Sequence, residues 1–62
     1  MPIVNISLIE GRDDESKARL IEKVTDAIED SIGAPRPTIR VLLNEVPAAH
    51  WGTGGVPKSK SS

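Results

Sequence analysis

The apolar pattern of this 62-residue chain predicts one amphipathic helix between two strands, and this feature most limits its fold. Apolar and polar residues alternate over 2–9 and again over 38–46, which is the period of a strand. Between them, over 14–32, the apolar residues recur at helical spacing, at Leu20, Ile21, Val24, Ala27, Ile28 and Ile32. This order predicts parallel strands joined by a right-handed crossover.

The elements have recognisable ends. Asp13 is a good N-cap, Gly33 fits the position after the helix, and Pro35 cannot continue it. Residues 35–37 (Pro-Arg-Pro) form a stiff connection, and glycines at 52, 54 and 55 predict a short hairpin. We therefore expect an α+β fold in a single domain over 1–62, with a frayed tail from about 58 to 62.

One helix covers only one face of such a sheet. Ile3, Ile9, Arg40 and Leu42 share the other face, and a two-stranded sheet with a bare face is not stable alone. The chain contains no cysteine, so neither a disulfide nor a thiolate metal site supports it. Because small chains without such supports often gain stability by self-association, we expect a homo-oligomer.

Charge and hydropathy exclude several classes of function. Eight basic and nine acidic residues give a net charge of −1, which argues against nucleic-acid binding and disfavours a small DNA-binding dimer. The longest apolar run, over 41–43, is too short to cross a membrane, and no secretory signal is visible. The absence of cysteine is compatible with a reducing compartment, and we expect a cytoplasmic protein.

Pro2 is the strongest catalytic candidate. Removal of Met1 would leave Pro2 as a free secondary amine, whereas with Met1 attached its nitrogen is an amide and cannot act as a base. An apolar pocket or a nearby cation would keep this amine neutral at physiological pH, as a general base requires. The alternative is that Pro2 only begins an edge strand, which proline tolerates.

Two arginines are candidates for binding a carboxylate. Arg40 lies among apolar strand residues, and its alternative role is a structural ion pair or polar contact with Glu45 or Asn44. Arg12 lies in a turn, and its alternative is a solvated surface charge. Pro2 and Arg12 lie at opposite ends of the first strand, more than about 20 Å apart at 3.3 Å per residue. If they cooperate, Arg12 comes from a neighbouring subunit.

The remaining candidates are less specific. His50 is the only histidine, so a zinc site is improbable, and a lone loop histidine is more often structural than a base. Trp51 is the only aromatic residue, and it either walls a pocket or pins an interface. The glycines after it lack the sequence of a phosphate-binding loop.

Taken together, Pro2, Glu10-Gly11-Arg12, Ile39-Arg40-Val41 and His50-Trp51-Gly52 with Gly54-Gly55 resemble the 4-oxalocrotonate tautomerase family. The resemblance covers the chain from Pro2 to about Gly55. It implies a β-α-β subunit with parallel strands, assembled as a homohexamer that is a trimer of dimers, and an isomerase without a metal or organic cofactor. Its partners would be a small enol or keto acid and other copies of the chain, with no nucleic acid and no membrane.

The resemblance also implies roles for residues. Pro2 would be the catalytic base and acid, and neighbouring subunits would supply Arg40 and Arg12, the two arginines that act on the substrate. Three further residues match substrate-binding positions of the family: Ile9 through its backbone amide, Thr38 through its hydroxyl, and Trp51 as an aromatic wall. Trp51 departs from the usual phenylalanine, and the water-activating carboxylate of the dehalogenase branch is not found near Gly52.

The implied reaction is ketonisation of a 2-hydroxydienoate, such as 2-hydroxymuconate, to an α,β-unsaturated 2-oxo acid, in keeping with catabolism of aromatic compounds. One alternative is a phenylenolpyruvate tautomerase with a monocarboxylate substrate, for which Arg12 would matter little. Another is a non-catalytic oligomeric binding module with the same fold.

Overall fold

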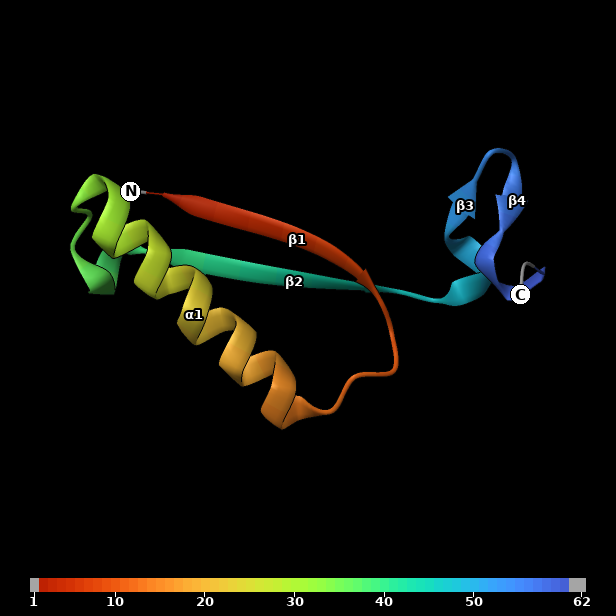
Figure 1. The fold of residues 1–62 in the computed structure, drawn as a ribbon, viewed down its shortest axis with the longest axis horizontal. Coiled ribbons are helices and arrows are strands. Elements are labelled where there is room, and N and C mark those ends of the chain that lie inside the picture. Colours follow the sequence, from red (N-terminus) through yellow and green to blue (C-terminus); the bar gives the residue numbers. More distant parts are fainter. Residues whose placement is uncertain (1, 61–62) are drawn as a thin grey trace.

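In the computed structural model, which describes residues 2–60, a strand–helix–strand unit is followed by a small hairpin (Figure 1). β1 (Ile3–Ile9) and β2 (Arg40–Val46) pair in parallel, and α1 (Asp14–Ile32) connects them. β3 (Gly52–Thr53) and β4 (Val56–Pro57) pair antiparallel. The predicted α+β class, β-α-β order and C-terminal hairpin are confirmed.

The helix α1 begins and ends where its capping residues predict. The Asp13 carboxylate accepts a hydrogen bond of 3.0 Å from the backbone amide of Ser16, which satisfies a free donor of the first turn. Gly33 has a φ of 71°, in the left-handed region that favours glycine, and its amide donates to the Glu29 carbonyl at 3.0 Å. The predicted bounds of the helix are confirmed.

The second strand begins later than predicted. Thr38 belongs to a 3-10 helix, η1 (Arg36–Thr38), and β2 begins only at Arg40. The Thr38 amide and hydroxyl both donate to the Pro35 carbonyl, at 2.9 and 2.7 Å, and close a turn before the strand pairing begins. The stiff connection expected over 35–37 is therefore continued by a short helical turn that includes Thr38.

The strand pairing places one set of side chains toward α1 and another set on the uncovered face. Ile3 pairs with Arg40 and Asn5 pairs with Leu42 on the uncovered face, whereas Val4 and Ile6 belong to the set toward α1. Of the large apolar side chains on the uncovered face, Ile3 is 59% exposed and Leu42 is 48% exposed. Among the described residues only Ile39 is buried, so a single chain has almost no core of its own.

The C-terminal segment continues beyond β2 as η2 (Ala48–His50), the hairpin and η3 (Lys58–Lys60), and it projects away from α1 (Figure 1). The Lys58 backbone amide donates to the Trp51 carbonyl at 2.7 Å. Within the tail expected to fray from about 58 to 62, Lys58–Lys60 form a turn of 3-10 helix, and residues 61 and 62 lie outside the described residues.

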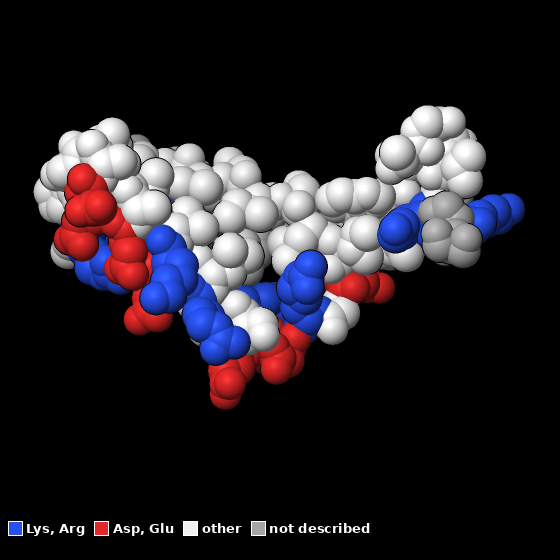
Figure 2. Space-filling view, viewed as in Figure 1, with Lys and Arg blue, Asp and Glu red and all other residues white. Residues whose placement is uncertain are grey.

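The chain is far from compact. Its radius of gyration is 14.5 Å and its extents are 42 × 24 × 14 Å, whereas a compact domain of this length has a radius of about 10.6 Å. Charged side chains gather over α1 and the C-terminal segment, and uncharged atoms lie along β1 (Figure 2). No helix within residues 2–60 has the length and apolarity needed to cross a membrane.

Candidate active site

One group of predicted site residues meets where β1 and β2 begin. The Arg40 backbone amide donates to the Pro2 carbonyl at 3.0 Å, directly before the pairing of Ile3 with Arg40. Because the strands are parallel, their first residues lie at the same edge of the sheet. Pro2 is half-buried at this edge, and Thr38 lies two residues before Arg40.

The Arg40 guanidinium is oriented by a single backbone acceptor. Its Nη1 donates to the Pro37 carbonyl at 2.8 Å, and the side chain is exposed. A guanidinium has five N–H donors, so others remain for a carboxylate. Arg40 makes no ion pair within residues 2–60.

Glu45, the ion-pair partner considered for Arg40, lies on the other face of the sheet. It pairs with Leu8 in the strand register and accepts a hydrogen bond of 2.9 Å from Lys17 of α1. Hydrogen bonds to Glu45, and then to Asp14, raise the pKa of Lys17. The prediction of an Arg40–Glu45 pair is therefore wrong.

The Thr38 hydroxyl has a local partner. Its Oγ1 donates to the Pro35 carbonyl at 2.7 Å, and the side chain is half-buried. The lone pairs of the oxygen remain able to accept a hydrogen bond, but its one proton is engaged. Thr38 is thus positioned beside Arg40 by the η1 turn rather than by the strand.

A second group of predicted site residues lies at the other end of the sheet. Ile9 pairs with Val46 at the last step of the strand pairing, Arg12 is exposed in the loop before α1, and Trp51 is half-buried after η2. The seven residues of β1 separate the two groups, by about 23 Å at 3.3 Å per residue. Figure 1 shows the N-terminal end of the chain and the loop that leads into α1 at opposite ends of β1. The described chain therefore holds the two groups at opposite ends of the sheet and does not bring them together.

His50 is not part of a metal-binding cluster within the described residues. It ends η2 with its side chain exposed, and its backbone amide donates to the Pro47 carbonyl at 2.8 Å. Within the described part of the chain, no three His, Cys, Asp or Glu side chains gather as they would around a metal ion.

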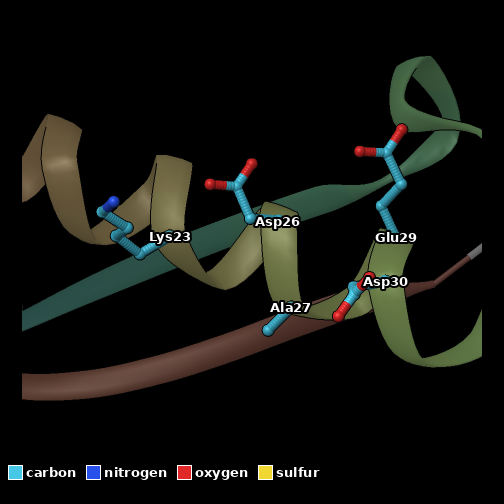
Figure 3. A pocket seen from close by; sticks show the side chains of 5 residues that line it. All are labelled: Lys23, Asp26, Ala27, Glu29 and Asp30. Carbon is cyan, nitrogen blue, oxygen red and sulfur yellow. The ribbon is translucent and has the colours of Figure 1, made fainter.

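A shallow open groove of about 610 Å³ runs along the outside of α1 (Figure 3). It contains none of the predicted site residues and is lined by Lys23, Asp26, Ala27, Glu29 and Asp30. Two of its carboxylates, those of Asp26 and Glu29, form ion pairs with a residue that lies outside the helix.

That residue is Arg36, which the sequence interpretation treated only as part of a connection. Its Nη1 lies 2.7 Å from an Asp26 oxygen and 3.1 Å from a Glu29 oxygen. The hydrogen bond to Asp26, supported by Glu29, raises the pKa of Arg36. The available signal was an arginine between two prolines, shortly after two acids spaced by three residues on one helix.

Comparison with known proteins bears on this arrangement. The family described as tautomerase enzyme matches residues 2–61. This chain belongs to the 4-oxalocrotonate tautomerase family, and it is an isomerase. It is 56% identical over 59 residues to a probable tautomerase of Ralstonia nicotianae, covering 95% of this chain and 84% of that protein.

Two further relatives extend the comparison. A 2-hydroxymuconate tautomerase of a Pseudomonas species is 48% identical over 60 residues, covering 97% of this chain and 95% of the relative. A solved heterohexameric 4-oxalocrotonate tautomerase of Chloroflexus aurantiacus superposes with a TM-score of 0.94 at 31% identity, covering 100% of both chains. The predicted family membership and isomerase class are confirmed.

Proposed function

We propose that this tautomerase ketonises 2-hydroxydienoates, such as 2-hydroxymuconate, to α,β-unsaturated 2-oxo acids without a cofactor. The observation that carries the proposal is the meeting of Pro2 and Arg40 at one end of the sheet, where the Arg40 backbone amide donates to the Pro2 carbonyl at 3.0 Å. The 2-hydroxymuconate tautomerase of the Pseudomonas species supports the substrate class.

Pro2 would act as both base and acid. Removal of Met1 would free the Pro2 nitrogen as a secondary amine, and an apolar pocket or a nearby cation would favour its neutral form. The neutral amine takes the proton of the 2-hydroxyl group and returns a proton to the vinylogous carbon. Because one group takes and returns the proton, the reaction needs no redox partner and no metal.

The two arginines would divide the substrate between them. Arg40 holds the carboxylate next to the reacting oxygen and stabilises the negative charge that develops there. Arg12 holds the distal carboxylate of a dicarboxylate substrate. In the same proposal, contacts come from the Ile9 backbone amide, the Thr38 hydroxyl and the Trp51 ring.

The complete site would form between chains. Neighbouring copies would supply both arginines, and within one chain Arg12 lies at the opposite end of the sheet from Pro2. We propose a homohexamer built as a trimer of dimers; the uncovered sheet face and the heterohexameric relative support it. A cytoplasmic location and a role in catabolism of aromatic compounds stay predictions.

The test is the rate of 2-hydroxymuconate ketonisation by the wild-type protein and by Pro2→Ala. Intact mass first establishes that Met1 is absent, and light scattering establishes that both proteins have the same assembly. General-base catalysis contributes about 100- to 10,000-fold, so a loss of at least about 100-fold is expected. Equal rates would refute the role of Pro2, and equal rates no faster than the uncatalysed reaction would leave a non-catalytic module with this fold.

A further inference from the structure

Arg36 pairs with two carboxylates of α1, although it lies outside the residues proposed to touch substrate. Its Nη1 meets Asp26 at 2.7 Å and Glu29 at 3.1 Å. Figure 3 shows these two carboxylates projecting from the same side of α1. A single exposed ion pair contributes little to stability, but a guanidinium that is shared by two carboxylates is more strongly restricted in position.

Arg36 is also the first residue of η1, the turn that leads into β2. Its carbonyl accepts a hydrogen bond of 3.1 Å from the amide of Ile39, the buried residue. Arg36 thus joins the last turns of α1, through its side chain, to the start of β2, through its backbone.

The same turn holds the Arg40 guanidinium. Within η1, Pro37 contributes the carbonyl that accepts from Arg40 Nη1 at 2.8 Å, while the Arg40 amide donates to Pro2 at 3.0 Å. A shift of η1 therefore moves the guanidinium relative to the Pro2 end of β1. An error of about 1 Å in such a group can cost about 100-fold in rate.

The two prolines of the connection do not by themselves fix this placement. Proline restricts its own φ, which is −61° at Pro35, and disfavours helical geometry in the residue before it. It leaves open how the turn as a whole lies against the helix. The ion pairs from Arg36 to Asp26 and Glu29 connect η1 directly to α1.

We propose that Arg36 is a positioning residue: its ion pairs with Asp26 and Glu29 hold η1 against α1, so that the Pro37 carbonyl keeps the Arg40 guanidinium in place. The activity test of this inference rests on the proposed function. The spectroscopic test on the Arg40 side chain rests only on the geometry of η1.

The activity test is a double-mutant cycle. Arg36→Ala is expected to lower kcat/KM for 2-hydroxymuconate about tenfold, and Arg36→Lys to lower it less because a charge remains. In an Arg40→Ala background, Arg36→Ala should cause no further loss. Asp30→Asn is the matched control, because Asp30 lies in the same groove and makes no ion pair within the described residues. An undiminished effect of Arg36→Ala in the Arg40→Ala background would overturn the proposal.

A second readout does not depend on activity. The Arg40 Nε–Hε resonance is expected to shift in Arg36→Ala and in the Asp26→Asn/Glu29→Gln double variant, and to stay unchanged in Asp30→Asn. An unchanged resonance in both of the first two proteins would overturn the role of Arg36, even if Pro2→Ala is inactive. Conversely, an active Pro2→Ala protein would refute the proposed function and leave the resonance test intact.

Discussion

Leu42 is the side chain whose replacement tests whether the uncovered sheet face is an interface between copies of this chain. It pairs with Asn5 on that face, beside the pairing of Ile3 with Arg40. We expect Leu42→Asp to dissociate the assembly, because it places a carboxylate where an apolar contact is needed. Leu42→Ile is the matched control, since it keeps the volume and the apolar character.

The magnitude follows from exposure. Leu42 is 48% exposed and Ile3 is 59% exposed in the single chain. Complete burial of such a side chain contributes about 1.5–3 kcal/mol, so covering the exposed half of each contributes about 1 kcal/mol. Two copies meeting through this face bury four such side chains, or about 4 kcal/mol, which corresponds to roughly 1,000-fold in the dissociation constant. An aspartate removes half of this and adds the cost of desolvating its charge.

The assay combines light scattering with denaturation followed by circular dichroism at two protein concentrations. Only Ile39 is buried within the described single chain, so dissociation and unfolding should occur together, and stability should depend on concentration. Leu42→Asp is expected to lose both mass and helix at micromolar concentration, whereas Leu42→Ile keeps them. A Leu42→Asp protein with the wild-type mass and denaturation midpoint would refute the interface.

Two further predictions concern substrate and pH. Arg12→Ala is expected to lower kcat/KM for 2-hydroxymuconate about 100-fold and to change that for phenylenolpyruvate little; equal losses on both substrates in steady-state assays would contradict a role for Arg12 in holding the distal carboxylate. Hydrogen bonding by Ser16, first through its side chain and then through its backbone amide, lowers the pKa of Asp13. Because the folded-state pKa lies below the unfolded value, the stabilisation is present above the unfolded pKa and is lost as pH falls through the folded one. The denaturation midpoint of Asp13→Ser should therefore lie below that of wild type at about pH 6 and approach it as pH falls below the ordinary pKa range of an aspartate; a constant difference would contradict this.

The elements that local chemistry determines could be predicted from the sequence. Asp13 and Gly33 act through hydrogen bonds within one turn of the helix, so the residue types alone locate both helix ends. The alternation of apolar residues likewise placed Arg40 and Leu42 on the uncovered face, as the strand pairing shows.

The features that depend on distant contacts could not be predicted. Thr38 continues the strand pattern in sequence, but the Pro35 carbonyl captures both of its donors and ends the strand early. Glu45 is near Arg40 in sequence but lies on the opposite face, where Lys17 holds it. The ion pairs of Arg36 with Asp26 and Glu29 depend on how the connection after α1 packs against the helix, which local sequence patterns do not predict.

The division of the site into two half-sites is the most testable part of the proposed function. Chains with Pro2→Ala and chains with Arg12→Ala are unfolded together, refolded as an equal mixture, and assayed for 2-hydroxymuconate ketonisation beside each variant refolded alone. If Pro2 and Arg12 of one site come from different chains, about a quarter of the sites in a random mixture hold both residues, and the mixture should recover about a quarter of the wild-type rate. A mixture no faster than the average of the two separate variants would contradict a site shared between chains.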